Sequence, residues 1–255
     1  MTRRSRVRQW RGGGPYSLGL HRHDQVNRAF GGGLPRGSLV LLTGETGAGK
    51  SAFAGRFAHG LCSESHPVTL LSTDRPVRRF LSQMRALGYE VGRHLAASQL
   101  LYLHGDVAGT EGTPARELLA RLAASERMWA ADVVLLDSFD DVLRYDAGFD
   151  RLRSATDRRR AARRVVSFLS SITDNGRTVV VTLDPTGLPE PVVDPFRRLA
   201  DCVLELARQP TERTAERWID VRRFAGTTAP VDDRIRFRIR PGAGIVIDDR
   251  VVVRL

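Results

Sequence analysis

The chain has 255 residues, of which 42% are hydrophobic and 27% charged, and its formal net charge is +11. This composition is that of a globular protein and excludes disordered and collagen-like chains, and no apolar run is long enough to cross a bilayer. Cys62 and Cys202 lie in segments with the pattern of a core, so we expect reduced, buried thiols in a cytoplasmic protein.

The positive charge is unevenly distributed. Residues 1–30 contain seven arginines and one aspartate, and so does the stretch Arg151–Arg164. Such basic segments can bind nucleic acid, an acidic partner or anionic lipid headgroups, or can simply be solvated faces. Because residues 1–15 are also rich in glycine, we expect them to form a flexible basic tail, followed by a single domain over residues 16–255.

The first predicted element is a strand over Ser38–Thr43, followed by a glycine-rich motif and a helix over Ala52–Leu61. The motif contains Lys50, which is the only lysine among 40 basic residues. A compact amine on a flexible stem binds phosphate differently from a planar guanidinium, so this position requires lysine. The sequence between strand and helix matches the phosphate-binding pattern G-x-x-x-x-G-K-[ST] and comprises Gly44, Glu45, Thr46, Gly47, Ala48, Gly49, Lys50 and Ser51.

A strand, a glycine loop and a helix in this order form a cradle for a nucleotide such as ATP. The glycines allow backbone N–H groups to converge on the anion, and the helix start, which includes Ala52, adds unpaired donors and the positive end of its dipole. We expect Lys50 to reach the β- and γ-phosphates and the hydroxyl of Ser51 to bind Mg²⁺. No motif that would distinguish ATP from GTP is visible.

The next predicted strand, Val68–Ser72, is followed by Asp74. Ligands bind at the carboxyl ends of the strands in an open parallel sheet, so Asp74 is a candidate catalytic residue that would polarise the attacking water. The alternative is that Asp74 caps the helix predicted over Pro76–Leu87.

Further alternation of strand and helix precedes a second acidic position. A third strand is predicted over Leu100–Leu103, and a helix with an apolar face that includes Leu118, Leu119, Leu122 and Met128 opens at Thr113–Pro114. The run Val133–Leu136 then ends in Asp137, the pattern of a buried strand with a carboxylate at its end. We expect Asp137 to be catalytic and, together with Ser51, to hold Mg²⁺.

The rest of the chain predicts further strands and helices of the same sheet, followed by a run of short strands joined by turns. A polar loop is expected up to Asp150, with Asp140 and Asp141 at a helix start. A long helix over Thr156–Thr173, a strand over Thr178–Leu183 and an acidic loop beginning at Asp184 follow. Four short strands are expected at Cys202–Leu206, Trp218–Arg223, Ile235–Arg240 and Gly244–Ile247. The fold class is therefore α/β, with a mostly parallel central sheet flanked by helices and a C-terminal run of antiparallel strands. The histidines, including His21 and His23, show no ligand spacing, so no structural metal is predicted.

In the order and composition of its motifs, the chain resembles the RecA/KaiC-like ATPases, and within them the archaellum ATP-binding proteins of the FlaH (ArlH) type. Besides the phosphate loop and the strand ending at Asp137, the resemblance rests on Tyr16–Leu20, Gly31–Ser38, Thr69–Thr73, Gln83–Met84, Thr182–Pro185, Arg223–Gly226 and Gly244–Ile247.

The resemblance implies a RecA-like P-loop NTPase fold and a cytoplasmic, ATP-binding component peripheral to the membrane-bound archaeal motility motor. It further implies a homo-oligomer that forms hexameric rings beside the motor ATPase and the membrane platform protein. In KaiC-like rings a late basic pair reaches the neighbour's nucleotide, which corresponds here to Arg222 and Arg223; the alternative is that both belong to an edge strand. The family has glutamate where this chain has Asp74, and its salt-adapted members are acidic where this chain is basic.

The shorter side chain at position 74 favours a slow ATPase or a binding switch. Its carboxylate lies about 1 Å away from the usual place, and a misplacement on that scale can reduce a rate by about 100-fold. Two other functions stay open from the sequence. One is a recombinase-like DNA-binding ATPase, supported by the basic segments but opposed by three carboxylates in the loop Asp184–Asp194, which makes nucleic acid an unlikely partner. The other is a KaiC-like autokinase regulator. No direct membrane insertion is expected.

Overall fold

A computed structural model of the 255-residue chain describes residues 14–20, 24–105, 107, 117–210, 215–227 and 229–248. The predicted tail up to residue 13, the pair His21 and His23, and the predicted helix start at Thr113–Pro114 lie outside the described residues.

Within the described residues, one nine-stranded sheet forms the centre of the molecule, with strand order β3-β2-β4-β5-β1-β6-β7-β8-β9. The first six strands in that order are mutually parallel, and β7, β8 and β9 are added antiparallel at one side. The strands are β1 Leu39–Thr43, β2 Val68–Ser72, β3 Leu100–His104, β4 Val133–Asp137, β5 Thr178–Leu183, β6 Cys202–Pro210, β7 Ala215–Phe224, β8 Arg234–Arg240 and β9 Gly244–Ile247. The predicted fold class is therefore confirmed.

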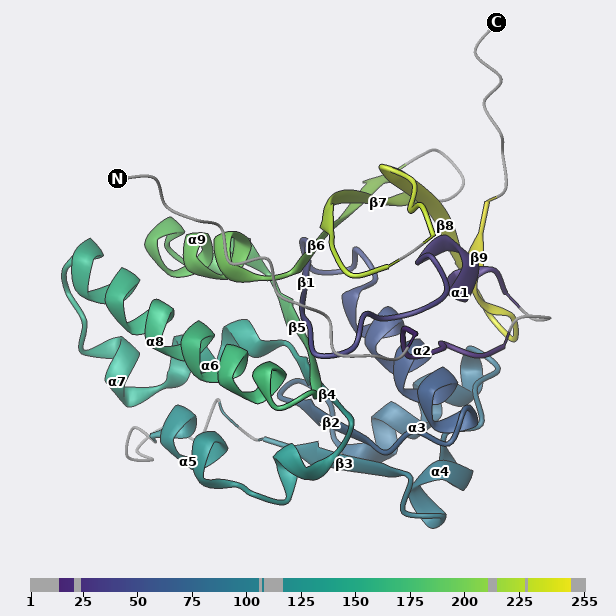
Figure 1. Ribbon diagram of the computed structural model, residues 1–255, viewed down its shortest axis with the longest axis horizontal. Coiled ribbons are helices and arrows are strands. Elements are labelled where there is room, and N and C mark those ends of the chain that lie inside the picture. The colour runs from purple at the N-terminus through teal and green to yellow at the C-terminus, as the bar shows by residue number, and fades with distance from the viewer. Residues whose placement is uncertain are drawn as a thin grey trace, which may run out of the picture.

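Helices cover both faces of the parallel part of the sheet, because the central strands are apolar on both sides (Figure 1). In β1, Val40 and Leu42 point into one core cluster and Leu39 and Leu41 into the other. The first face is covered by α1 Val26–Ala29, α2 Lys50–Ser63, α3 Val77–Ala86 and α4 Gly92–Ala96, and the second by α5 Leu118–Ala124, α6 Phe139–Tyr145, α7 Ala147–Asp150, α8 Ala155–Asp174 and α9 Glu190–Leu199. None of the described helices is both long and apolar enough to span a bilayer.

Two segments that were expected to be loops contain helices. The predicted polar loop up to Asp150 is wrong: α6 and α7 occupy it, because Phe139, Val142 and Leu143 are spaced to pack on the second core cluster. The position of Asp140 and Asp141 in the first turn of α6 agrees with the expected helix start. The predicted loop after Leu183 is also wrong, since a short 3₁₀ turn over Pro185–Gly187 leads into α9.

A buried ion pair fastens the N-terminal segment to α2. The side chain of Arg56 is fully buried, and its guanidinium donates two hydrogen bonds to Asp24, at 2.6 Å to Oδ2 and 2.8 Å to Oδ1. It donates two more, to the carbonyl oxygens of Leu18 at 2.7 Å and Gly19 at 3.2 Å. Because each of its three nitrogens donates to this segment, Arg56 links three points of it to the helix that begins at the phosphate loop.

The end of α3 is fastened to the turn between β8 and β9. The backbone N–H of Gly242 donates to the carbonyl of Ala86 at 2.8 Å, and the N–H of Ile245 donates to the hydroxyl of Tyr89 at 2.8 Å. Gly88 lies in the left-handed region, with φ of +84°, and a Cβ there would lie 2.4 Å from the carbonyl oxygen of Gly242. Glycine is therefore required at this contact.

Candidate functional site

The glycine-rich loop follows β1 and leads directly into α2, as the sequence predicts. Gly44 has a φ of +155°, and a Cβ at that position would lie 2.4 Å from the carbonyl oxygen of Leu206 on β6. Gly49 is the left-handed N-cap of α2, with φ of +116° and no side-chain cap. The first N–H groups of α2 are therefore not capped by a side chain, an arrangement that suits an anionic ligand.

Lys50 is 8% exposed and directs its ammonium group back onto the loop. The ammonium donates to the carbonyl oxygens of Gly44 and Glu45, the latter at 3.1 Å, and lies 3.8 Å from Oδ2 of Asp184. A nearly buried cation needs hydrogen-bond acceptors of this kind. The arrangement keeps the amine beside the loop, from which phosphate oxygens can take over its hydrogen bonds.

A cavity of about 840 Å³ opens in front of this loop. It is lined by Thr46, Gly47, Gly49, Lys50, Ser51 and Ala52 from the loop and α2, and by Asp74, Arg75, Gln83, Ser138, Asp140 and Asp184, among others, from neighbouring elements. Its size is within the usual range for sites that bind a small ligand. At the tip of the loop the guanidinium of Arg217 donates to the carbonyl of Gly47 at 3.5 Å, which adds positive charge there.

Asp137 ends β4 as predicted and is buried, with 4% of its side chain exposed. Its Oδ1 accepts a hydrogen bond from the hydroxyl of Thr182 at 2.9 Å, and its Oδ2 lies 3.2 Å from Nη2 of Arg75. Burial raises the pKa of Asp137 above its usual value, although the charge of Arg75 and hydrogen bonds from Thr182 and Ser51 act in the opposite direction.

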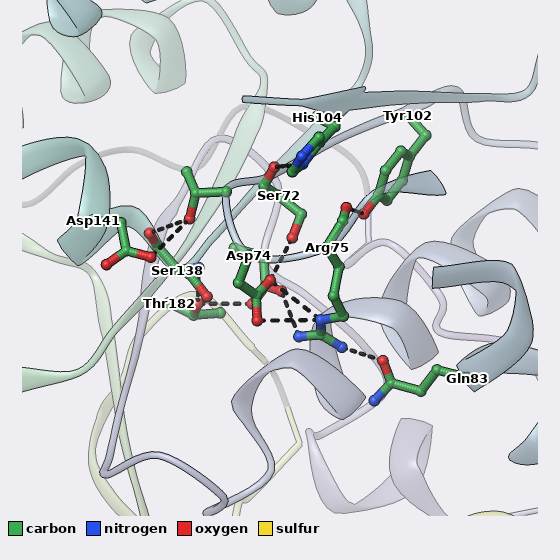
Figure 2. Close-up of polar contacts among 11 residues, drawn as sticks. Ser72, Asp74, Arg75, Gln83, Tyr102, His104, Ser138, Asp141 and Thr182 are labelled. Carbon is green, nitrogen blue, oxygen red and sulfur yellow. Dashed lines mark hydrogen bonds and ion pairs between the residues drawn. The ribbon is translucent and has the colours of Figure 1, made fainter. Parts of the chain in front are cut away.

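Asp74 lies just past the end of β2 and lines the same cavity. Its carboxylate accepts hydrogen bonds from the hydroxyl of Ser72 at 2.8 Å and from Nε of Arg75 at 3.2 Å (Figure 2). The N-cap of α3 is Pro76, and no side chain caps that helix. The alternative interpretation of Asp74 as a helix cap is therefore wrong, and the side chain belongs to the cavity.

Arg222 and Arg223 are not among the residues that line this cavity. Arg222 pairs with Glu205 at 2.7 Å, and Arg223 donates to the carbonyl oxygens of Ala200 and Arg198. Both lie at the carboxyl end of β7, whereas Arg217 near the start of that strand reaches the loop. Within one chain the pair therefore has a structural role in the sheet, and its predicted contact with a neighbour's nucleotide stays a prediction.

Sequence reasoning did not place Asp184 in the site. Asp184 follows β5 and joins the phosphate loop, because its Oδ2 accepts from the hydroxyl of Thr46 at 2.9 Å and faces Lys50. Although burial opposes it, hydrogen bonds from Thr186 and Thr46 together with the charge of Lys50 hold the pKa of Asp184 below its usual value. The sequence did contain a signal for this position, because Asp184 directly follows an apolar buried strand, much as Asp137 ends one.

The oxygen atoms of Ser51 and Asp137 fit the magnesium ion expected there. A hydroxyl and a carboxylate beside a phosphate site are the hard ligands that Mg²⁺ takes, with water and phosphate oxygens completing its shell. Among the described residues there is no group of three or more His, Cys, Asp or Glu side chains that could hold a metal ion by themselves. Ser51 and Asp137 are thus the two side chains that would hold the expected Mg²⁺ beside a bound phosphate.

The fold and this site define a P-loop nucleotide-binding protein with a RecA-like sheet. The family model for the KaiC ATPases matches residues 24–251. The chain therefore belongs to the KaiC family of ATPases.

Comparison with individual proteins agrees with the predicted resemblance to the FlaH type. The chain is 24% identical over 225 residues to the archaeal flagellar ATP-binding protein FlaH of Methanocaldococcus jannaschii, which covers 88% of this chain and 92% of that one. It is 23% identical to FlaH of Methanococcus voltae, covering 88% and 94%, and 26% identical to the circadian clock protein KaiC2 of Synechocystis, covering 82% and 36%. The crystal structure of the M. jannaschii FlaH superposes with a TM-score of 0.79 at 23% identity, covering 89% of this chain and 96% of that one. The KaiC-like protein PH0186 of Pyrococcus horikoshii superposes with a TM-score of 0.68 at 21% identity, covering 92% and 98%. The chain is thus a KaiC-like ATPase that is similar to FlaH over nearly its whole length.

Proposed function

We propose that this protein is the ATP-binding switch of an archaeal motility motor, in which bound Mg·ATP promotes assembly and hydrolysis is slow or absent. The observation that supports it most directly is the phosphate loop, in which a nearly buried Lys50 lies against its own loop carbonyls at the mouth of a cavity. The relatives named as archaeal flagellar ATP-binding proteins cover nearly the whole chain, which supports the motor as the setting.

In this proposal each residue of the site has a defined task. Gly44 to Ala52 hold the phosphates, with Lys50 at the terminal ones, and Ser51 and Asp137 hold Mg²⁺, which neutralises phosphate charge. Asp74 is the candidate for orienting water. Its carboxylate accepts a hydrogen bond from Ser72, and it is shorter than the glutamate of the family, so both features favour binding over rapid hydrolysis.

The assembly part of the proposal concerns partners outside the chain. We propose a homo-hexameric ring, in which Arg222 and Arg223 approach a neighbour's nucleotide, next to the motor ATPase and the membrane platform protein at the cytoplasmic side. Arg222 is 60% exposed on its side chain and pairs with Glu205, so it is accessible for such a contact.

The test of nucleotide binding is Lys50→Ala, with Arg164→Ala, an exposed position on α8, as the matched control. Charge-assisted hydrogen bonds are each worth about 1.5–3 kcal/mol, so the variant should bind ATP roughly 10- to 100-fold more weakly by isothermal titration. The control should bind like the wild type. Equal affinity with and without Lys50 would rule out the proposed function.

The test of the switch is gel filtration with and without Mg·ATP, with turnover measured on the same sample. The proposal expects a larger assembly with Mg·ATP and little phosphate release. A constant monomer, or fast turnover, would contradict it.

A DNA-binding ATPase is the second candidate, because the structure removes part of the argument against it. Glu190 pairs with Arg197 at 3.2 Å and Asp194 with Arg198 at 2.6 Å on α9, while Asp184 turns into the nucleotide site. The three carboxylates therefore do not form the acidic loop expected from the sequence. ATP-dependent, salt-sensitive binding of single-stranded DNA in a fluorescence anisotropy titration would favour this candidate.

A further inference from the structure

Arg75 lies between the two carboxylates to which the site assigns chemical roles. Its Nη2 lies 3.2 Å from Oδ2 of Asp137, and its Nε lies 3.2 Å from both carboxylate oxygens of Asp74. The same guanidinium therefore bridges the predicted metal-binding carboxylate on β4 and the predicted catalytic carboxylate after β2. No sequence motif pointed to this residue.

Contacts on its remaining sides hold Arg75 in this position. Its Nη1 donates to the side-chain oxygen of Gln83 on α3, and its backbone carbonyl accepts from the hydroxyl of Tyr102 on β3 at 2.6 Å (Figure 2). The ring of Tyr102 in turn stacks on Phe80 of α3, with 4.4 Å between the ring centroids. Only 17% of the Arg75 side chain is exposed, so its guanidinium is held in position by protein groups and is largely shielded from solvent.

The environment of Asp137 explains why a cation is needed there. An ionised carboxylate that is 4% exposed requires a compensating charge. Its Oδ1 accepts a hydrogen bond from Thr182, and its Oδ2 accepts one from Nη2 of Arg75, which is the cation in contact with it. A magnesium ion held by Ser51 and Asp137 would supply the same compensation, so Mg²⁺ and Arg75 compete for Asp137.

We propose that Arg75 is a tethered counter-cation that substitutes for Mg²⁺ at Asp137 in the nucleotide-free protein and must leave when Mg·ATP binds. It is a positioning residue, because it acts on the site through Asp137 and Asp74. The proposal rests on the proposed function as an ATP-binding switch and adds a regulation to it: the protein remains in its unloaded form until magnesium is sufficient to displace Arg75. Departure of Arg75 also releases Asp74 and Gln83 together.

The test is the magnesium concentration needed for half-maximal binding of a fluorescent ATP analogue at a fixed analogue concentration. Arg75→Gln should lower this concentration by about 10-fold or more, because the competing charge-assisted contacts are lost. Arg75→Lys should lie between the two, since an amine keeps the charge but cannot form the same fork of hydrogen bonds. Arg79→Gln is the matched control on the exposed side of α3 and should behave like the wild type.

Gln83→Ala provides a second route to the same answer, since it removes an anchor of Arg75 and leaves the guanidinium in place. It should lower the magnesium requirement in the same direction by a smaller factor, and it covers the case in which Arg75→Gln does not fold. An unchanged or higher magnesium requirement in Arg75→Gln, or in Gln83→Ala where the former is unfolded, overturns the proposal. Lys50→Ala, measured in parallel, distinguishes failure of the proposed role of Arg75 from failure of the proposed ATP-binding function. If Lys50→Ala loses binding of the analogue while Arg75→Gln leaves the magnesium requirement unchanged, only the role of Arg75 is refuted.

Discussion

Removing the carboxylate of Asp24 should destabilise the protein strongly, because it leaves a positive charge in the core without its partner. Arg56 is fully buried and makes two of its four hydrogen bonds to Asp24, at 2.6 and 2.8 Å. The two carbonyl oxygens that remain, from Leu18 and Gly19, can accept hydrogen bonds but bear no compensating charge. Breaking one partner of such a buried pair costs about 3–5 kcal/mol.

This magnitude gives a clear experiment. For a chain of about this size, 1 kcal/mol corresponds to roughly 2–4 °C in melting temperature, so Asp24→Ala should melt roughly 6–20 °C below the wild type. Asp24→Asn should lose less, because an amide oxygen can still accept one hydrogen bond from the guanidinium. The measurement is urea or thermal unfolding followed by circular dichroism, with reversibility checked.

The matched control is another Asp–Arg pair of the same chain. Asp157 pairs with Arg160 at 3.4 Å on α8, with 50% and 67% of the side chains exposed. Exposed pairs contribute about 0–1 kcal/mol, so Asp157→Ala should be close to the wild type, apart from the loss of its bond with the capping residue Ser154. If Asp24→Ala and Asp157→Ala lowered the free energy of unfolding equally, burial would not be the reason that Arg56 depends on Asp24.

Two further predictions concern the core and the metal site. Thr182→Val should lower the free energy of unfolding by about 1–3 kcal/mol, because it removes the hydroxyl that donates to Oδ1 of Asp137 and accepts from the N–H of Ser138. An unchanged midpoint of urea unfolding would refute this prediction. Thr186→Val is the control, since it makes the same change at an exposed position. Burial raises the pKa of the Cys62 and Cys202 thiols to about 12, so both thiols are protonated at roughly pH 8 and should not react with a chromogenic disulfide reagent in the native protein. Both thiols should react once the protein is unfolded in guanidinium chloride at about 6 M. Fast labelling of the native protein would contradict their burial.

The parallel part of the fold was predictable because its signals are local. The strands β1, β2, β4 and β5 are short apolar runs buried on both faces, and the phosphate loop has a pattern of fixed spacing that dictates what precedes and follows it. Asp74 and Asp137 could be located because parallel strands place their carboxyl ends along one edge.

Helix α9 and the role of Arg75 could not be predicted, because both depend on contacts between residues far apart in the chain. Helix α9 has Pro195 in its interior and Pro191 in its first turn, so its sequence resembles a loop, and packing of Val192, Val193 and Phe196 makes it helical. The role of Arg75 depends on Asp137, Gln83 and Tyr102, which come from three other elements. The sequence alone shows an arginine after an aspartate, and only the assembled sheet shows which charges it faces.

Helix α3 is fastened at both of its ends. At the first, Arg75 connects it to the nucleotide cavity, and at the second, Gly242 and Ile245 connect it to the turn before β9 and to β9 itself. These hydrogen bonds therefore place α3 between the nucleotide cavity and the antiparallel strands. Strand β8 also reaches this cavity directly, because Ile239 is among the residues that line it, so the antiparallel strands belong to the surroundings of the nucleotide site although they do not form its phosphate loop.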